Sequence, residues 1–269
     1  MLANGQRYSK RSLTMVVCAF NEEELIEEFL EKSIRDLSHV TQDWEIILVN
    51  DGSVDRTSEL AHKVALDWPQ IRIFDQAVNR GPGACIQIGF YNATKDYVFH
   101  NTVDAFFNTE DLTWVLPLLD KHDSLSGYRK DLKANNLYQK LLTTCNRGLI
   151  YTLFPLKLKA YQTVQFHPRA LYDQIRIEGK SSFVAAELLL KAFYLGYRIG
   201  EFEVEFHPRT KGVAKGGGIK HVLRSIKDIF KFWFLWVVLK RPISNSWAAK
   251  QVRAATVASE VASSVRIAG

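Results

Sequence analysis

Apolar residues gather in four short runs along the first hundred positions of the chain. The runs lie at residues 13–18, 45–49, 71–74 and 97–100. Runs that are apolar at nearly every position are typical of strands buried on both faces of a parallel sheet. Between the runs, apolar residues recur at helical spacing over residues 25–37, 58–66 and 84–93. This alternation of strands and helices predicts a parallel, right-handed α/β sheet.

The rest of the chain predicts five more helices and three more strands. Helical patterns cover residues 111–119, 137–153, 170–175, 183–195 and 219 to about 239, and strand patterns end near residues 129, 169 and 206. A glycine run at residues 216–218 predicts a flexible hinge before the last helix. We therefore expect an α/β domain over residues 12–215, a separate helix over 219–241 and a tail over 248–269.

Asp51 lies in a polar turn that directly follows the second apolar run. The turn therefore falls at the carboxyl end of a strand, where open α/β sheets bind their ligands. A carboxylate there can accept hydrogen bonds from a nucleobase or from a ribose. Ser53, Asp55 and Thr57 follow in the same turn, and helix N-capping is the alternative role for these three residues.

A second turn, Asn79-Arg80-Gly81-Pro82-Gly83-Ala84, opens the third helix. A glycine-rich turn at the start of a helix offers backbone N–H groups to a phosphate. A simple capped turn is the alternative. The first helix instead begins with three acids, Glu22 to Glu24, which suits the positive end of a helix dipole.

The composition is that of a folded protein, with 47% hydrophobic and 24% charged residues in 269 positions. The three cysteines, Cys18, Cys85 and Cys145, are far apart in the sequence and form no Cys-x-x-Cys pair. This spacing indicates neither a disulfide framework nor a zinc cluster. A reducing, cytoplasmic setting is expected, and the polar residues 1–10 do not resemble a signal peptide.

Positive charge is concentrated near the end of the chain. The whole chain carries a formal charge of +6, whereas residues 209–241 alone hold nine basic residues and one acid, Asp228. The remainder is slightly acidic, which argues against a general nucleic-acid-binding surface. A local anionic partner, a phosphate or a lipid, is the expected one.

The last helix combines this charge with apolar residues. One apolar face is predicted from residues that recur at helical spacing: Ile219, Val222, Leu223, Ile226, Ile229, Phe230, Trp233 and Val237. The continuous apolar run from Phe232 to Leu239 is too short to span a bilayer, which needs about 20 residues. Basic flanks with Trp and Phe are typical of a helix that lies in the membrane interface. A core helix packed on the sheet and a homo-oligomer contact are the alternatives.

Several motifs follow one another in a characteristic order. They are Val17-Cys18-Ala19-Phe20-Asn21-Glu22, Val49-Asn50-Asp51-Gly52-Ser53-x-Asp55-x-Thr57 and Asn79-Arg80-Gly81. Together with an Asp after the fourth strand, they resemble the inverting glycosyltransferases of family 2, which have the GT-A fold. Segments 126–129, 186–189, 196–201 and 207–215 resemble the branch that makes polyprenol-phosphate sugars, such as the dolichol-phosphate mannose synthases. The resemblance covers roughly residues 12–235.

The resemblance implies a nucleotide-sugar donor and assigns residues to it. The base and ribose would be held by Phe20, Glu22 and Asp51, with Arg80 and Gly81 near the nucleotide. Asp104 would lie beside the diphosphate and its Mg²⁺ or Mn²⁺. The basic residues that would face the phosphates of donor and acceptor are Arg129, Arg209 and Lys215. Guanidinium groups match phosphate geometry, and cations stabilise a leaving nucleoside diphosphate.

The sequence departs from the family at two places. The family has Asp-x-Asp with a Gln two residues later, whereas this chain has Asp104-Ala105-Phe106-Phe107-Asn108. Phe106 cannot ligate a metal, although Asn108 could offer an amide oxygen, so metal binding is expected to be weak or absent. At residues 160–166 the chain also lacks the Asp and the Ser-Gly that the family usually has.

The leading hypothesis is transfer of a sugar to a polyprenyl phosphate at the cytoplasmic face of a membrane, in the assembly of cell-envelope polysaccharide. A phosphate acceptor is already anionic near neutral pH, so direct attack needs no strong base. A first rival is a family 2 enzyme acting on a hydroxyl, with Asp104 or Glu187 as base. Glu187 could equally be structural, since it is one acid within an apolar helix. A second rival, suggested by Phe106, is a weakly active nucleotide-sugar-binding protein.

Overall fold

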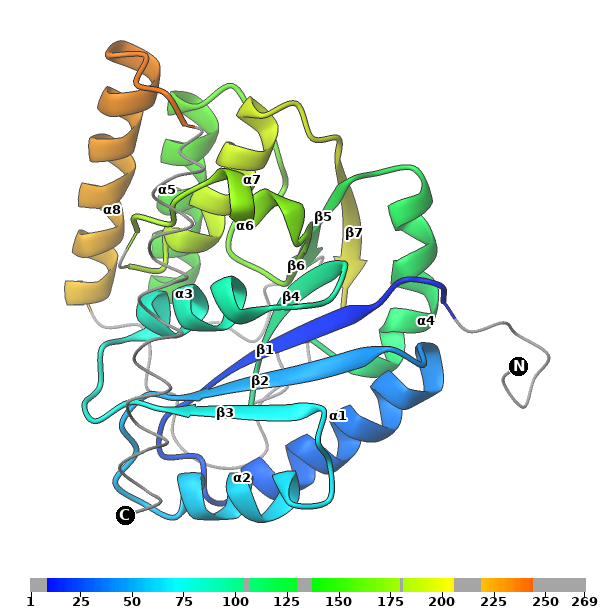
Figure 1. Cartoon of the computed structure of the whole chain (residues 1–269). Coiled ribbons are helices and arrows are strands. Elements are labelled where there is room, and N and C mark those ends of the chain that lie inside the picture. The colour runs from blue at the N-terminus through cyan, green and yellow to red at the C-terminus, as the bar shows by residue number, and fades with distance from the viewer. Residues whose placement is uncertain (1–8, 104–106, 130–136, 180, 206–218, 244–269) are drawn as a thin grey trace.

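A computed structural model describes residues 9–103, 107–129, 137–179, 181–205 and 219–243 (Figure 1). The strands within these ranges form one seven-stranded sheet with the order β3-β2-β1-β4-β6-β5-β7. Strand β6 is antiparallel to its neighbours β4 and β5, and the other pairs are parallel. The expected mostly parallel α/β sheet is confirmed.

The first half of the chain forms the expected alternation of strands and helices. Its elements are β1 (Leu13–Ala19), α1 (Ile26–Val40), β2 (Trp44–Asn50), α2 (Thr57–Ala65), β3 (Ile71–Asp75), α3 (Pro82–Asn92) and β4 (Tyr97–Thr102). Strand β1 lies between β2 and β4, so that Cys18 is opposite both Val49 and Thr102. The carboxyl ends of these three strands therefore meet at one edge of the sheet.

The second half holds shorter elements. They are η1 (Thr109–Asp111), α4 (Leu112–Val115), η2 (Leu116–Asp120), β5 (Ser124–Arg129), α5 (Leu137–Leu153), β6 (Gln165–Pro168), α6 (Ala170–Gln174), α7 (Val184–Tyr194), β7 (Ile199–Val204), α8 (Ile219–Trp233) and the π-helical turn η3 (Phe234–Val238). The helix predicted at residues 111–119 is divided, because Pro117 at the start of η2 lacks the N–H that would continue α4. The strand predicted to end near residue 129 is β5, and its residues 124–129 pair with β7.

Helices cover both faces of the sheet. Met15 and Val17 of β1 contact the cluster that α1, α2 and α4 build on one face, whereas Val16 contacts the cluster under α3, α6 and α7. Side chains along a strand alternate between the two faces, so a strand covered on both sides must be apolar throughout. This explains why the runs at β1, β2 and β4 identify central strands, whereas β3, at the edge of the sheet, is only partly buried.

Helix α3 lies unusually close to β1. A Cβ atom on Gly89 would come within 2.2 Å of Val16 Cγ1 and within 3.1 Å of Val16 Cβ. Only glycine fits there, because Val16 is fully buried in the middle of the sheet and its branched side chain cannot turn away. This contact packs the second half of α3 directly on the middle of β1.

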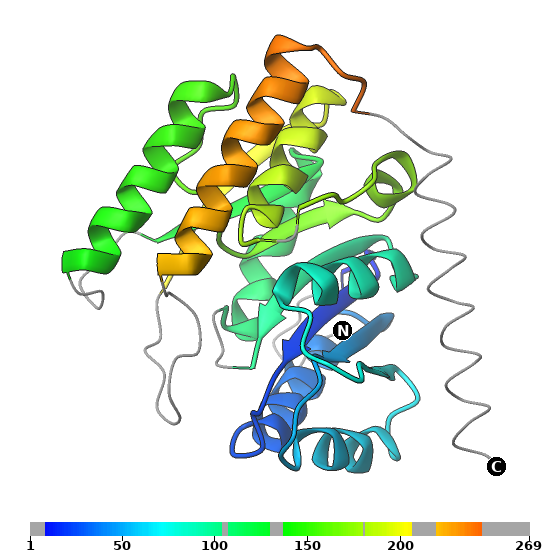
Figure 2. The same ribbon diagram turned by 90° about the vertical axis from the view of Figure 1, so that its left-hand side faces the viewer.

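Helix α8 packs on other helices rather than on the sheet. Figures 1 and 2 show α5, α7 and α8 side by side, and Ile229, Phe232 and Trp236 are buried against α5 and α7. The apolar face predicted from the sequence is only partly buried by this packing. Leu223 and Phe230, which were assigned to it with Ile229, remain 60% and 45% exposed. The helix is apolar on two sides, and only the side that carries Ser225, Ile229, Phe232 and Trp236 is packed.

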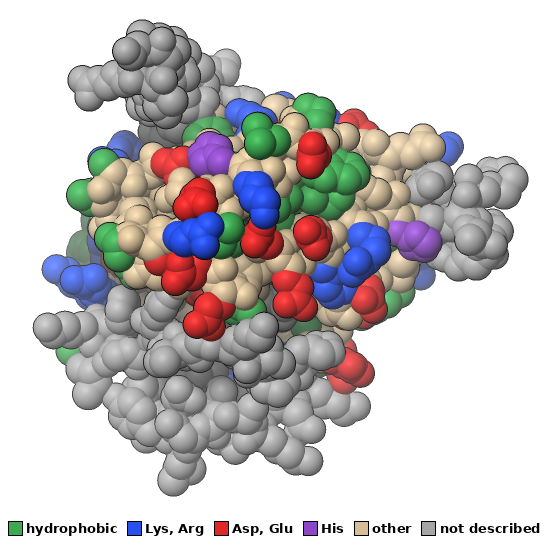
Figure 3. Space-filling view, turned by 90° about the horizontal axis from the view of Figure 1, so that it is seen from below, with side chains coloured by type: hydrophobic (Ala, Val, Ile, Leu, Met, Phe, Trp, Pro, Cys, Tyr) green, Lys and Arg blue, Asp and Glu red, His purple; other side chains and the backbone are tan. Residues whose placement is uncertain are grey.

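The outward side of α8 and η3 carries the exposed apolar residues Leu223, Phe230, Phe234, Val238 and Leu239. None of the helices within the described ranges is long and apolar enough to cross a lipid bilayer. On the face seen from below in Figure 1, over α1 and α2, acidic and basic side chains are interspersed without a basic patch on the visible surface (Figure 3).

The contact between Gly89 and Val16 can be tested by adding one methyl group. Gly89→Ala should lower the free energy of unfolding by about 1–3 kcal/mol, because the overpacking of Val16 outweighs the better helix propensity of alanine. Gly148→Ala is the matched control, since Gly148 is exposed in α5 and its Cβ would meet nothing within 4 Å. Urea denaturation should show the control to be equal to or more stable than the wild type. A Gly89→Ala protein of unchanged stability would contradict the close approach.

Candidate active site

Three loops meet at the carboxyl edge of the sheet. The loops follow β1, β2 and β3, and the backbone joins them. Ala19 O accepts a hydrogen bond from Asp51 N at 2.8 Å, and Asn50 O accepts one from Gln76 N at 2.9 Å. The motifs that were singled out in the sequence lie on these three loops.

Asp51 is buried at the centre of this arrangement and holds the glycine-rich turn. Its carboxylate accepts hydrogen bonds from the backbone N–H of Arg80 at 2.8 Å and of Gly81 at 2.9 Å, and from Gln76 Nε2 at 3.0 Å. Gly81 is the N-cap of α3 and has a φ of +86°, which strongly favours glycine. Asp51 therefore shapes the start of α3, and its direct contact with a nucleotide stays a prediction.

Gly52 brings the second and third loops into direct contact. Its φ is +71°, and an added Cβ would lie 2.7 Å from the carbonyl carbon of Val78 and 2.8 Å from Asn79 N. Both the backbone conformation and the lack of space require glycine. The Asp51-Gly52 pair of the motif thus has a physical reason. Asp51 binds the turn at Arg80 and Gly81, and Gly52 lets the loop at Val78 come close.

The first loop is fixed to the second by side chains. Ser53 Oγ accepts from Asn21 N at 2.9 Å, Thr57 Oγ1 accepts from Glu22 N at 2.7 Å, and Asn21 Oδ1 accepts from Val54 N at 2.9 Å. Asn21 has a φ of +53°, a conformation that asparagine tolerates better than most residues. These bonds orient the residues on either side of Asn21, namely Phe20 and Glu22.

Ser53, Asp55 and Thr57 do not have the simple capping role that was considered for them. The N-cap position of α2 is occupied by Arg56, whose side chain makes no capping bond. Asp55 instead accepts from Thr57 N at 3.0 Å and from Glu23 N at 3.3 Å. The polar side chains at the start of α2 therefore join two loops, and only Asp55 also supports the first turn of the helix.

The structure brings the five predicted nucleotide residues together on these loops. They are Phe20 and Glu22, both half-buried, Asp51, which is buried, and Arg80 and Gly81, which are exposed and half-buried. The Asp51 carboxylate is buried, whereas the Arg80 side chain and the turn at Gly81 remain accessible. This arrangement suits a bound anion. Their contacts with a nucleotide stay a prediction.

Asp104, Ala105 and Phe106 lie outside the described residues, but the chain on both sides is fixed. Asn101, buried in β4, donates from Nδ2 to Phe107 O at 2.9 Å and accepts from Phe107 N at 3.1 Å. Phe107 packs edge-on against Phe99 and Phe166 in the core. The segment that carries Asp104 therefore begins and ends at the same carboxyl edge of the sheet.

Asn108 has a structural role in this region. Its Oδ1 accepts from Glu110 N at 3.4 Å and caps the short helix η1. The hydroxyl of Thr109 donates to Asp36 of α1, and Lys32 pairs with both Asp36 and Glu110 at 2.8 and 2.7 Å. These contacts attach residues 107–110 to α1.

The weak metal binding expected from the sequence stays a prediction, because Asp104 lies outside the described residues. Among the described residues, no group of three or more His, Cys, Asp or Glu side chains is arranged to hold an ion. The amide oxygen of Asn108 is engaged with Glu110 N, and Phe106 replaces the second carboxylate of the motif. Hard cations prefer several carboxylate or water oxygens, and neither Asn108 nor Phe106 offers a free carboxylate.

The predicted phosphate ligands are only partly described. Arg129 is the last residue of β5 and is half-buried, opposite Val204 in β7. The Lys159 ammonium lies 3.9 Å from the ring centroid of the neighbouring Tyr128. Arg209 and Lys215 lie outside the described residues. The carboxyl end of β5 thus presents positive charge at the same edge as Asp51.

Glu187 has the structural role that was its alternative. It is fully buried, pairs with Lys191 at 2.6 Å and accepts from Glu178 N at 2.8 Å and Gly179 N at 2.6 Å. Burial raises the pKa of this carboxyl group, while Lys191 and the two N–H groups oppose that shift. Every oxygen contact is internal, so Glu187 is unsuited to act as a base on a substrate.

Three supporting residues were missed in the sequence. Gln76 follows β3 directly, and the strand-end rule that identified Asp51 could have identified it as well. Lys191 stands four residues after Glu187, a spacing that signals an ion pair on one helix face. No sequence signal marks Asn101 as the residue that holds the chain around Asp104.

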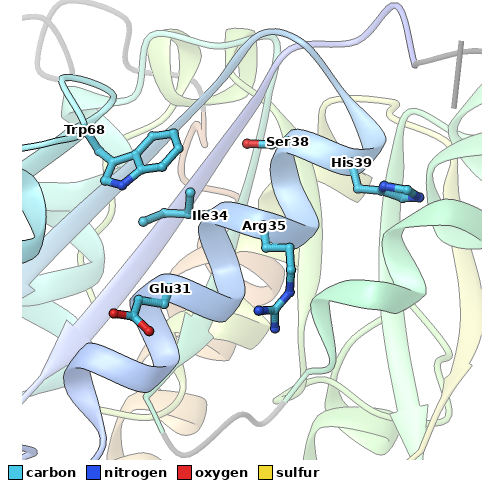
Figure 4. Close-up of a pocket in the computed structure, with 6 residues that line it drawn as sticks. All are labelled: Glu31, Ile34, Arg35, Ser38, His39 and Trp68. Atoms are coloured by element: carbon cyan, nitrogen blue, oxygen red, sulfur yellow. The ribbon is translucent and has the colours of Figure 1, made fainter. Parts of the chain in front are cut away.

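A surface hollow of about 410 Å³ lies elsewhere, along the outer side of α1 (Figure 4). It is lined by Glu31, Ile34, Arg35, Ser38, His39 and Trp68. Trp68 precedes the amino end of β3, so the hollow lies toward the edge of the sheet opposite to Asp51. It is not part of the site described above.

Solved structures of glucosyl-3-phosphoglycerate synthase from Mycobacterium tuberculosis share the fold. One, in complex with phosphoglyceric acid, has a TM-score of 0.61 at 18% identity, over 84% of this chain and 79% of that chain. Another, with Mn²⁺, UDP-glucose and phosphoglyceric acid, has a TM-score of 0.59 at 17% identity, over 87% and 81%. At this identity the likeness concerns the fold alone.

Curated relatives include enzymes named for polyprenyl-phosphate substrates. A dodecaprenyl-phosphate galacturonate synthase from Rhizobium johnstonii is 28% identical over 235 residues, which cover 86% of this chain and 69% of that protein. A dolichyl-phosphate beta-glucosyltransferase from Trichomonas vaginalis is 36% identical over 104 residues, or 37% of this chain. The match spans only 32% of that second protein, about a third of its length.

The comparison with protein families covers the part of the chain that builds the site. The family described as glycosyl transferase family 2 matches residues 14–173, from β1 through α6. This range is more than half of the chain and includes the three interlocked loops, β4 and β5. The chain belongs to glycosyl transferase family 2.

Proposed function

We propose that the protein transfers a sugar from a nucleotide-sugar to a polyprenyl phosphate, with inversion at the anomeric carbon. The observation that carries this proposal is the joining of three motif-bearing loops around Asp51, whose buried carboxylate holds the loop after β3 and whose backbone N–H bonds to Ala19 O of the loop after β1. The names of the relatives, which act on dodecaprenyl and dolichyl phosphate, support the lipid acceptor. The mixed apolar and basic outward side of α8 supports it independently.

The nucleotide half of the donor occupies the three loops. The ring of Phe20 and the carboxylates of Glu22 and Asp51 hold the base and ribose. The backbone of Arg80 and Gly81 borders the nucleotide, and the exposed Arg80 guanidinium supplies positive charge. Because Asp51 already orders the turn at Gly81, the loop needs little reorganisation when the ligand binds.

The chemical step is a single displacement. A phosphate oxygen of the acceptor attacks the anomeric carbon, a new C–O bond forms, and the bond to the nucleoside diphosphate breaks with its electron pair on the leaving oxygen. The attacking oxygen is already anionic near neutral pH, so no proton must be removed. Arg129, Arg209 and Lys215 stabilise the charge of the acceptor phosphate and of the leaving diphosphate.

Transfer to a hydroxyl group is less well supported. That reaction needs a general base, and Glu187 is buried in an internal ion pair with Lys191. Asp104 would then be the remaining candidate from the sequence. The phosphate acceptor removes this requirement.

The outward side of α8 and η3 binds an anionic lipid surface in this proposal. Arg224, Lys227 and Lys231 are exposed on the helix whose outward side carries Phe230 and Phe234. Each basic residue near an anionic surface contributes about 1 kcal/mol, and buried aromatic rings add apolar contact. The bilayer would present the acceptor phosphate beside the enzyme, on the cytoplasmic side.

A turnover assay tests the function. UDP-glucose and UDP-galacturonic acid are each offered with and without detergent-solubilised undecaprenyl phosphate, and with and without Mn²⁺. Formation of glycosylated lipid and release of UDP only when the lipid phosphate is present would support the proposal. Nucleotide binding without turnover for a panel of nucleotide-sugars would favour the binding-protein rival.

Replacement of Asp51 should weaken nucleotide binding. Asp51→Ala removes a carboxylate that contributes charge-assisted hydrogen bonds worth about 1.5–3 kcal/mol, so the affinity should fall roughly ten- to a hundredfold. Calorimetry with UDP, and with GDP if UDP does not bind, measures the change. Glu59→Gln, in an exposed ion pair of α2, should bind as the wild type does. Unchanged affinity in a folded Asp51 variant would exclude Asp51 from the site.

Metal binding should depend on the nucleotide. The protein alone offers too few oxygen ligands, whereas a bound diphosphate adds its own, so Mn²⁺ should bind only together with the nucleotide. Phe106→Asp should raise the affinity for Mn²⁺, with Phe107→Leu as a neighbouring control. Micromolar binding of Mn²⁺ to the ligand-free wild type in calorimetry would contradict the first expectation. An unaltered Phe106→Asp affinity would show that the motif is misaligned.

The outward side of α8 should direct binding to vesicles. Truncation after Gly218 would also remove Ile229, Phe232 and Trp236 from the core, so substitutions are the better test. Phe230→Ser with Phe234→Ser should reduce co-sedimentation with anionic vesicles roughly tenfold or more, because two exposed rings that would insert into the bilayer are lost. Leu66→Ser, an exposed leucine at the end of α2, is the control. Wild-type protein that stays in the supernatant at low salt would contradict a membrane role.

A further inference from the structure

The segment that leads into α7 lies at the carboxyl edge of the sheet, near the end of β5. We call residues 176–179 and 181–183 the entry segment. Helix α7 precedes β7, which is parallel to β5, so α7 begins at the same carboxyl edge as Arg129. Gln162, in the loop before β6, donates from Nε2 to Ser182 O at 3.1 Å. The entry segment thus borders the loop where the sequence departs from its family.

Buried side chains hold the first part of the entry segment. Ile177 N donates to the Tyr91 hydroxyl of α3 at 2.7 Å, and the N–H groups of Glu178 and Gly179 donate to Glu187. Lys191 is 1% exposed and pairs with both Glu187 and Glu178. These bonds fix one end of the segment to α3 and α7.

Helix α8 holds the other end. Ser181 Oγ donates to Asp228 Oδ2 at 2.7 Å and accepts from Phe183 N at 3.2 Å. Phe183 stacks on Phe232, with ring centroids 5.5 Å apart and an interplanar angle of 14°. The segment is therefore joined to α8 by one polar and one aromatic contact.

Asp228 is unusual on its helix. It is the only acid in residues 219–243, where six basic residues surround it in the sequence. Its side chain points inward, to Ser181, while Lys227 and Lys231 beside it are exposed. An acid weakens the attraction of a helix to an anionic surface. Its contact with the entry segment gives a physical reason for an acid at this position.

A second polar connection runs parallel to the first. Ser225 Oγ of α8 donates to Asn146 Oδ1 of α5 at 3.5 Å, and Asn146 Nδ2 donates to Gln162 Oε1 at 2.9 Å. Gln162 in turn bonds the carbonyl of Ser182. The inner side of α8 thus contacts the entry segment directly through Asp228, and indirectly from Ser225 through Asn146 and Gln162.

We propose that Asp228 is a positioning residue, through which docking of α8 on an anionic lipid surface orders the entry segment beside the acceptor. The proposal rests on the proposed membrane-bound transferase. The outward side of α8 meets the lipid, and the inner side carries Asp228 one helical turn from Ser225 and from Phe232. A shift of the helix on docking therefore reaches Ser181 without any contact between Asp228 and lipid.

Hydrogen–deuterium exchange of the full chain tests this coupling without any substrate. Vesicles of phosphatidylglycerol and phosphatidylcholine should slow exchange of the amides of Ile177, Glu178, Gly179 and Phe183 in the wild type by about fivefold or more. Asp228→Ala should sediment with the vesicles at least as well, yet its entry segment should not respond. Asp228→Asn is the matched variant. It has the same net charge as Asp228→Ala, but its amide oxygen can still accept a hydrogen bond from Ser181. It should respond as the wild type does.

The outcomes separate the hydrogen bond from charge and from general stability. Ser182→Ala alters an exposed neighbour whose carbonyl alone is used, and it should keep the wild-type response. The proposal is overturned if Asp228→Ala keeps the response, if Asp228→Asn loses it equally, or if vesicles leave the wild-type segment unchanged or do not bind. Transfer to detergent-solubilised undecaprenyl phosphate needs no vesicle, so the transferase proposal can hold while this coupling fails.

Discussion

The carboxylate of Asp51 is the interaction on which the candidate site depends. It is buried, and it accepts hydrogen bonds from two consecutive backbone N–H groups and from Gln76. A buried charge is tolerated only where such donors replace water. Those donors come from the loop after β3, so the charge fixes that loop against the loop after β2. The start of α3, the glycine at residue 81 and the exposed Arg80 all take their positions from this contact.

Three other residues keep that arrangement at the edge of the sheet. Gly89 lets α3 approach β1 closely, and Gly52 lets the loop at Val78 lie on the turn that carries Asp51. Asn101 holds both sides of the segment that contains Asp104. The polar groups of the site are thus fixed by backbone hydrogen bonds and close contacts, which leaves the half-buried side chains of Phe20 and Glu22 at the surface of a rigid frame.

The last helix shows how one amphipathic segment can serve two surfaces. Its inner side fills the space between α5 and α7, and Trp236, in the π-helical turn η3, lies in the same buried cluster as Phe232. An insertion of one residue in a helical turn shifts the register of the side chains that follow. The outer side keeps apolar and basic residues in solvent, which an ordinary core helix would avoid.

The sequence by itself determined the sheet, the order of its strands and helices, and the loops on which the site lies. It could do so because strands covered on both faces must be apolar throughout, and because strand ends, glycine turns and helix periodicity are local signals. Asp51 was identified for its place after a strand, but its bonds to Arg80 N and Gly81 N join residues about thirty positions apart. The roles of Glu187 and of the two sides of α8 were likewise decided only by the tertiary structure. Periodicity shows that a helix is apolar, whereas the neighbours that cover it come from distant parts of the chain.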